Sequence, residues 1–135
     1  MIRRFRRYWN RLRGRRFWYV PYYAARRPEY FDFEQMAENV GPGWAPLLQK
    51  LTDKLFSLGW DGGLLQVKEK FGTLRFYHQN NVRDPLLAEV VEDVVEAAEN
   101  RSGQTCERCG KYGEVRGDGW LVTRCQGCWE KEKHR

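Results

Sequence analysis

Apolar residues recur three or four positions apart in the stretch "APLLQKLTDKLFSL", residues 45–58. They share one face of a helix, so the pattern predicts an amphipathic helix that packs on the core. Gly59 follows directly and is expected to cap its C-terminal end. Upstream, Asp32 is the expected N-cap of a short helix over residues 32–39, which "GPG" at 41–43 ends. The core-facing positions of the longer helix are Leu47, Leu48, Leu51, Leu55 and Leu58.

A second amphipathic helix is predicted over residues 84–100. Asp84 is a favourable N-cap, and Pro85 suits the first helical position because no backbone partner is needed there. Ser102-Gly103 ends the pattern. The positions expected to face inward are Leu87, Val90, Val91, Val94, Val95 and Ala98. The acidic positions expected to face water are Glu89, Glu92, Asp93, Glu96 and Glu99.

Between these two helices the apolar pattern changes from helical spacing to alternation. Leu65 and Val67 alternate with polar residues before a turn near Phe71-Gly72. Apolar residues at positions 74 and 76 alternate in the same way after the turn. Two alternating runs joined by a glycine-containing turn are typical of a β-hairpin.

All four cysteines lie near the C-terminus, in two C-x-x-C pairs separated by fifteen residues. Two residues between cysteines form a tight knuckle, and Gly110 suits the positive φ that often ends one. The spacer "GKYGEVRGDGWLVTR" predicts a hairpin, and "CQGCWEKEKHR" predicts a charged helix. This order resembles a zinc ribbon or treble clef, in which four thiolates hold one structural Zn²⁺. The expected ligands are Cys106, Cys109, Cys125 and Cys128.

Other uses of the four cysteines fit the sequence less well. Two disulfides need an oxidising compartment, and a thioredoxin-type redox motif needs a βαβ context that the tail lacks. A catalytic zinc keeps an open position, whereas four cysteines close the site. His134 is a possible substitute ligand, although a surplus histidine is the simpler interpretation. Trp120 and Trp129 are expected to pack around the metal module.

These elements predict an α+β fold, with two amphipathic helices on a small hairpin-based sheet and a four-cysteine zinc module docked at its end. We expect a basic N-terminal arm over residues 1–27, the α+β body over 28–102 and the zinc-binding module over 103–135.

Charge is distributed unevenly along the chain. The formal net charge is +6, yet residues 1–27 carry ten Arg and no acid, while the remainder carries 14 Lys and Arg against 18 Asp and Glu. Within that segment, residues 2–13 show a basic amphipathic helical pattern. Such a split predicts a cationic arm directed at a polyanion.

Arginines interleaved with aromatic residues neutralise phosphates and stack on bases, which is typical of proteins that bind single-stranded or structured nucleic acid. The rival interpretations are a peripheral membrane-surface helix, a tail that docks on an acidic protein, and a merely solvated segment. Basic residues of the hairpin are expected to extend the phosphate-binding surface. The predicted nucleic-acid contacts are Arg3, Arg4, Arg6, Arg7, Arg11, Arg13, Arg15, Arg16, Lys68, Lys70 and Arg75.

Catalysis is not expected. Asp61 and Glu69, with Lys68 and Lys70, supply the residue types of a metal-dependent nuclease, but their spacing fits such a site poorly. With two His in the whole chain, a hydrolytic triad is disfavoured, and a His-Asn-His nuclease would need a histidine beside the cysteine hairpin. The acidic helix over 84–100 could imitate the phosphates of nucleic acid on a host enzyme, although a solvated helix face is the simpler interpretation.

Three segments carry a resemblance to a known group: "GWAPLLQKL", "LGWDGGLLQVKEKFGTLRFY" and "CERCG…GWLVTRCQGC". Over residues 43–129 the chain resembles a group of small, uncharacterised proteins from bacteriophages, prophages and bacterial mobile elements. The resemblance names no activity. It implies a phage or prophage product that acts in the cytoplasm of a bacterial host.

The sequence therefore predicts a non-catalytic, zinc-stapled accessory protein that binds DNA or RNA through its arginine-rich arm. The alternative is an inhibitor or adaptor that binds a host or anti-phage defence protein. No apolar run approaches the roughly 18 residues of a membrane-spanning helix. No apolar stretch of the signal-peptide type follows the basic N-terminus, so a cytoplasmic location is expected.

Overall fold

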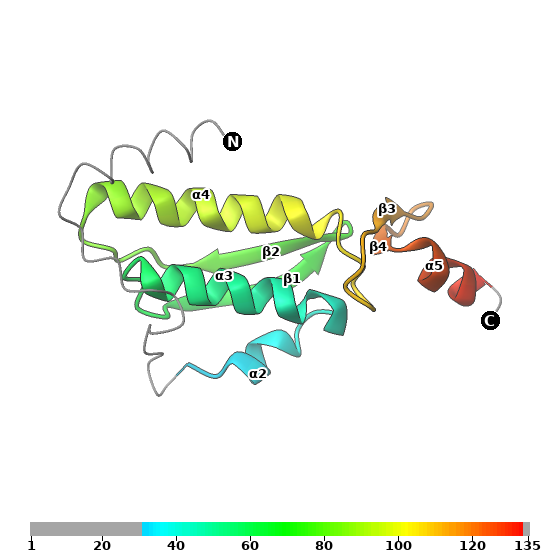
Figure 1. Cartoon of the computed structure of the whole chain (residues 1–135), viewed down its shortest axis with the longest axis horizontal. Coiled ribbons are helices and arrows are strands. Elements are labelled where there is room, and N and C mark those ends of the chain that lie inside the picture. The colour runs from blue at the N-terminus through cyan, green and yellow to red at the C-terminus, as the bar shows by residue number, and fades with distance from the viewer. Residues whose placement is uncertain (1–30, 134–135) are drawn as a thin grey trace.

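The computed structural model describes residues 31–133 of the 135-residue chain, so the predicted helix over residues 2–13 lies outside the described part. The fold is α+β, as predicted, with helices and two small antiparallel sheets (Figure 1). The elements are α2 (Phe33–Ala37), the 3-10 helix η2 (Pro42–Trp44), α3 (Ala45–Ser57), β1 (Leu64–Lys70), β2 (Thr73–His78), α4 (Pro85–Ser102), β3 (Glu114–Arg116), β4 (Val122–Arg124) and α5 (Gln126–Lys133).

The helix boundaries follow the capping signals of the sequence. Asp32 and Asp84 both act as N-caps, accepting hydrogen bonds from the backbone N–H groups of Gln35 at 3.1 Å and Leu86 at 2.8 Å. Helix α3 ends at Ser57, and Gly59 follows with a φ of +95°, a left-handed conformation that glycine adopts without strain.

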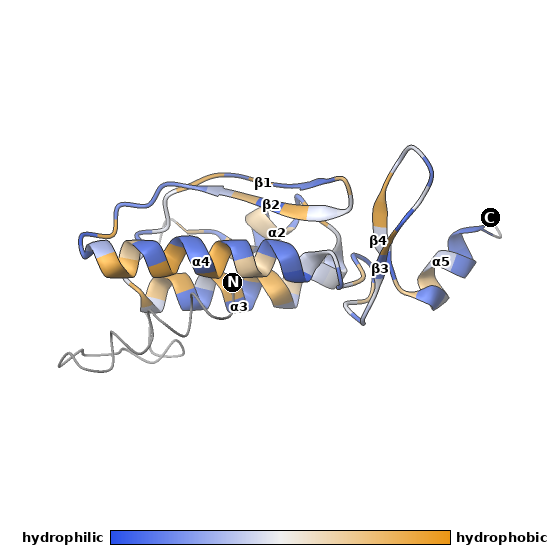
Figure 2. Cartoon of the chain, turned by 90° about the horizontal axis from the view of Figure 1, so that it is seen from above, coloured by the Kyte–Doolittle hydropathy of each residue, from blue (hydrophilic) through white to orange (hydrophobic). Residues whose placement is uncertain are grey.

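The two long helices lie side by side against one face of the β1–β2 hairpin, and no helix of residues 31–133 covers the opposite face of this sheet (Figures 1 and 2). Apolar residues of both helices and of the strands meet in a single core cluster. Its most deeply buried members are Trp44, Leu48, Leu55, Leu74 and Val91, all 0% exposed.

The β1–β2 hairpin has a two-residue turn at the predicted position. Phe71 and Gly72 have φ values of +54° and +78°, as a type I′ turn requires. Val67, Leu74 and Phe76 point into the core, but Leu65 is 65% exposed, because the register shifts between Leu64 and Gln66 and breaks the alternation.

Side chains of α4 satisfy the free edge of β2. The backbone N–H of Leu74 donates to Ser102 Oγ at 2.8 Å, and that of Phe76 donates to Glu99 Oε2 at 3.0 Å. Glu99 is therefore half-buried, and its carboxylate is hydrogen-bonded within the fold. The prediction that Glu99 faces water is wrong. A helix that closes one sheet edge leaves fewer unpaired backbone groups on a two-stranded sheet.

The prediction that Asp93 faces water is also wrong, because this residue is only 4% exposed. Helix α4 packs against both α3 and β2. Because two elements pack against α4, its buried face is wider than the stripe formed by its apolar residues, and Asp93 lies within that face. The other predicted acidic positions, Glu89, Glu92 and Glu96, are exposed.

The turn residue Phe71 gives a first prediction. Asparagine tolerates the left-handed conformation better than phenylalanine does, and Asn-Gly is the preferred type I′ pair. Because the Phe71 side chain is 63% exposed, little burial is lost by replacing it. We expect Phe71→Asn to raise the free energy of unfolding by about 0.5–1 kcal/mol.

Urea unfolding monitored by circular dichroism measures this difference. The matched control is Phe71→Val, which should lower stability because a β-branched residue is strained at positive φ. An asparagine variant no more stable than the parent protein would show that the turn is not strained by Phe71.

Candidate metal centre

The four cysteine sulfurs converge on one point. All four Sγ atoms lie within 4.8 Å of one another, and the Cys109 and Cys125 sulfurs are 3.5 Å apart. Sulfurs bound tetrahedrally at about 2.3 Å from a common metal ion lie about 3.8 Å from each other. The arrangement therefore matches a tetrathiolate metal site, and the described cysteines form no disulfide.

Local structure places each pair in the order predicted from the sequence: a knuckle, a hairpin and a helix. Cys106 and Cys109 lie in the knuckle, where Gly110 has a φ of +79° and donates its N–H to the Cys106 carbonyl at 3.0 Å. Cys125 directly follows β4, and Cys128 lies in the first turn of α5. The short β3–β4 hairpin thus brings the second pair to the first.

Local hydrogen bonds shift the pKa values of three of the four thiols in different directions. Burial opposes ionisation of Cys106, but backbone N–H groups of Cys125 and the knuckle outweigh it and lower its pKa to about 6. A backbone hydrogen bond from Cys128 also lowers the pKa of Cys125. In turn, the contact with Cys125 raises the pKa of Cys128 to about 12. A bound metal cation would replace the thiol protons, because the ligand form of cysteine is the thiolate.

The knuckle is docked on the body through close backbone contact. The N–H of Gly43 donates to the Glu107 carbonyl at 2.7 Å, and the indole Nε1 of Trp44 donates to the Thr105 carbonyl at 2.8 Å. A Cβ atom added at Gly43 would lie 2.1 Å from the Cys106 carbonyl oxygen, and one at Gly41 would lie 2.3 Å from that of Glu107. Only glycine fits at these two positions.

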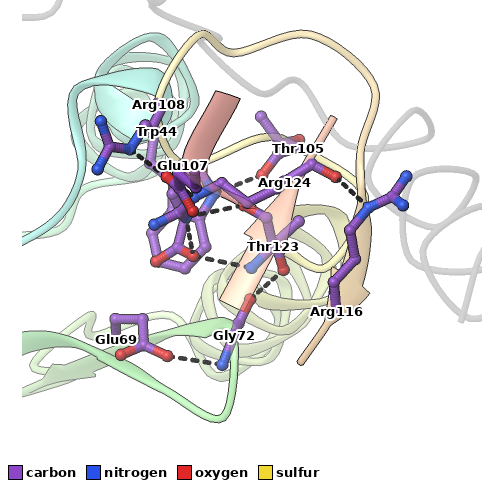
Figure 3. A network of polar contacts seen from close by, with 10 residues as sticks. Trp44, Glu69, Gly72, Thr105, Glu107, Arg108, Arg116, Thr123 and Arg124 are labelled. Carbon is purple, nitrogen blue, oxygen red and sulfur yellow. Dashed lines mark hydrogen bonds and ion pairs between the residues drawn. The ribbon is translucent and has the colours of Figure 1, made fainter. Parts of the chain in front are cut away.

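A buried ionic network holds the second strand pair to the same place (Figure 3). Glu107, 7% exposed, accepts hydrogen bonds from the Thr123 backbone N–H and from Arg124 Nη1, both at 2.8 Å. Burial raises the pKa of Glu107, against the opposing effects of these two donors. Burial also opposes the charge of Arg124, but its bonds to Glu132 and Glu107 outweigh this effect and raise its pKa.

The hairpin tip of the body completes the docking. Thr123 Oγ1 donates a hydrogen bond to the Gly72 carbonyl, and the Gly72 N–H donates to Glu69 Oε1 at 2.6 Å (Figure 3).

Sequence reasoning missed two features of this docking. One is the ionic network of Glu107, Arg124 and Glu132, and the other is the close contact that "GPG" makes with the knuckle. The sequence marks "GPG" only as a helix breaker, and nothing in it pairs residues so far apart.

The basic residues predicted on the hairpin share one surface. Strand pairing sets Lys68 opposite Arg75 and Lys70 opposite Thr73, with Gln66 opposite Tyr77. We call these six residues the outer face, because Val67, Leu74 and Phe76 turn to the core on the other side. The predicted arm contacts, Arg3, Arg4, Arg6, Arg7, Arg11, Arg13, Arg15 and Arg16, lie outside the described residues.

The carboxylates considered for a nuclease do not meet. Asp61 precedes β1, whereas Glu69 lies near its far end, beyond five residues of strand that span roughly 16 Å. Each also has a local role: Asp61 accepts from Gly63 N–H and Asn81, and Glu69 accepts from Gly72. Within residues 31–133, the cysteine cluster is the one group of metal-ligating side chains that converges.

The prediction that both tryptophans of the module pack around the metal site is wrong for Trp120. Trp129 is half-buried, with Lys133 Nζ 5.4 Å from its ring centroid. Trp120 is 78% exposed in the loop between β3 and β4, so it does not pack around the metal site. The loop joins β3 to β4 at one end of the hairpin, whereas Cys125 follows the other end of β4.

Comparisons with family models, curated proteins and solved structures gave no match. Among residues 31–133, none of the helices has both the length and the apolar character to cross a membrane.

The four-cysteine site predicts that the C-terminal module needs a bound metal ion to stay folded. We expect one divalent metal ion per chain, and a chelator should abolish amide protection in the C-terminal module, because metal binding supplies about 10–16 kcal/mol in small thiolate sites. Elemental analysis and hydrogen exchange at Cys106 and Thr123 measure this. Cys109→Ser should lose the metal, whereas His134→Ala should retain it. Full protection in metal-free protein would contradict the assignment.

The close contact between Gly43 and the knuckle predicts that a single methyl group added at position 43 lowers the stability of the protein. Gly43→Ala should lower the free energy of unfolding by about 1–3 kcal/mol, because two backbones must separate to admit it. Gly127→Ala is the matched control, since a Cβ there meets nothing within 4 Å and alanine favours helix α5. Thermal unfolding of the metal-loaded proteins makes the comparison, and equal stability of Gly43→Ala and the parent protein would refute the close contact.

Proposed function

We propose that this protein is a non-catalytic nucleic-acid-binding protein whose C-terminal module is stapled by zinc. The observation that carries the proposal is the outer face of the β1–β2 hairpin, where Lys68, Lys70 and Arg75 gather without an acidic residue among its six members. The rest of the chain beyond residue 27 has an excess of acid, so this face stands out. Lysine and arginine in such a group neutralise phosphates.

Zinc is the ion that the donor set favours. Four thiolates in a tetrahedral arrangement suit Zn²⁺, and magnesium and calcium prefer oxygen ligands. The four cysteine sulfurs leave no open coordination position, so the ion's role is structural. In a zinc ribbon or treble clef the metal sets the positions of the knuckle and hairpin. Here the knuckle abuts Gly41 and Gly43, and the hairpin abuts the tip of β1–β2.

The N-terminal segment supports the same function from composition alone. Residues 1–27 contain ten Arg, no Lys and no acid, with aromatic residues interleaved. Arginine binds phosphate through a planar fork of donors and stacks on bases. We propose that this segment supplies most of the affinity and that the outer face adds further contacts. The setting that fits the sequence resemblance is a phage or prophage product acting in a bacterial host.

A second candidate function rests on the opposite charge. The exposed side of α4 carries Glu89, Glu92 and Glu96, and a groove of about 390 Å³ runs beside it, lined by Glu92, Glu96, Glu99, His78 and Leu65, among others. An acidic helix face with an adjoining groove suits an inhibitor or adaptor that binds a basic host or defence protein. A pull-down from host lysate with and without nuclease separates the two functions, because only an adaptor retains its partner after nuclease treatment.

Salt dependence tests the primary proposal. If roughly 6–10 phosphates are neutralised, affinity for nucleic acid should fall about 10³–10⁵-fold between 50 and 200 mM salt. Fluorescence anisotropy with labelled DNA and RNA measures this for the full chain, with deletion of residues 1–27 as the comparison. Salt-insensitive binding, or binding of unchanged strength after the deletion, would refute the proposed role of the arm.

A further inference from the structure

The outer face of the β1–β2 hairpin combines positive charge with exposed aromatic rings. Tyr77 is 42% exposed on the face, and Phe71 is 63% exposed at the turn where the face ends. Lys68 Nζ lies 5.5 Å from the centroid of the Tyr77 ring, and Lys70 Nζ lies 5.6 Å from that of Phe71. A lysine therefore accompanies each exposed ring.

The position of Phe71 is not explained by stability. It is the one non-glycine residue with positive φ among residues 31–133, and its side chain is mostly in solvent. Glycine or asparagine would occupy the position with less strain. A strained residue that gains nothing from burial points to a functional role for its side chain.

The second hairpin borders this surface. Figure 2 shows the β3–β4 hairpin standing beyond the tip of β1–β2 and reaching past the sheet on the side away from α3 and α4. The two hairpins are in close contact at Gly72, because a Cβ there would lie 3.3 Å from both Val115 Cγ1 and Thr123 Oγ1. The loop of this hairpin carries Trp120, 78% exposed. The four-cysteine module thus lies at one end of the outer face, and its Trp120 is a third exposed aromatic ring.

We propose that the outer face is a stacking platform for single-stranded nucleic acid. Bases stack on Tyr77 and Phe71, and phosphates lie against Lys68, Lys70 and Arg75. Exposed rings need unpaired bases, because a duplex hides the faces of its bases and offers mainly phosphates. This inference rests on the proposed function and deepens it, since it names the strand state and two aromatic contacts that the arginine-rich arm does not supply.

The test measures binding of the full, metal-loaded chain by fluorescence anisotropy. The probes are labelled oligo(dT) and oligo(rU) strands of about twelve nucleotides, in the range of known single-strand sites, and a duplex of equal length. The variants are Tyr77→Leu and Phe71→Asn. Tyr112→Leu is the matched control, because Tyr112 is 69% exposed but lies near the knuckle, outside the outer face.

We expect Tyr77→Leu and Phe71→Asn each to weaken single-strand binding about 5- to 150-fold while duplex binding and Tyr112→Leu stay unchanged. Since Phe71→Asn should not destabilise the fold, its loss of binding would not come from unfolding. Comparison of the two single strands tells DNA from RNA as the preferred partner.

The two proposals fail in distinguishable ways. If neither single strands nor duplex bind at low salt, the proposed function itself is wrong. If the chain binds nucleic acid but both aromatic variants bind single strands as the parent does, the stacking platform is wrong and charge-based binding stands. Equal losses on duplex and single strand would likewise overturn stacking.

Discussion

Gly43 lies against the backbone of the cysteine knuckle, and the docking of the four-cysteine module on the body depends on this contact. Its N–H bonds to Glu107, and the next residue, Trp44, is fully buried in the core while its indole bonds to Thr105. One short segment thus belongs both to the hydrophobic core and to the surface that holds the cysteine module. Side chains at positions 41 and 43 would separate the two.

The four-cysteine site and this docking contact share the knuckle. A metal ion bound by the four thiolates would fix the knuckle that Gly43 touches, and from the knuckle Glu107 accepts a hydrogen bond from the backbone of Thr123. Thr123 then reaches the hairpin tip at Gly72. A metal ion bound at this end of the protein would therefore also stabilise the contact with the hairpin tip of the body. Small domains have a small core to supply such rigidity, which is why a metal is an effective source of it.

The two faces of the β1–β2 sheet have different tasks. One face carries Val67, Leu74 and Phe76 into the core, and α4 closes the β2 edge through Ser102 and Glu99. The other face keeps only charged, polar and aromatic side chains. The β2 edge and the inner face are satisfied within the fold, and none of the six outer-face residues belongs to the hydrophobic core of residues 31–133.

Local order along the chain was determined by the sequence. Helical leucine spacing, the caps Asp32 and Asp84, the turn at Phe71-Gly72 and the convergence of two C-x-x-C pairs all depend on residues close together, so short-range patterns predicted them. The tertiary structure alone decided the burial of Asp93, the exposure of Leu65 and Trp120, the glycine contacts at positions 41 and 43 and the Glu107–Arg124 pair. Trp44 and Thr105 are 61 positions apart. Contacts over such separations depend on how finished elements pack, and no periodicity of the chain encodes that.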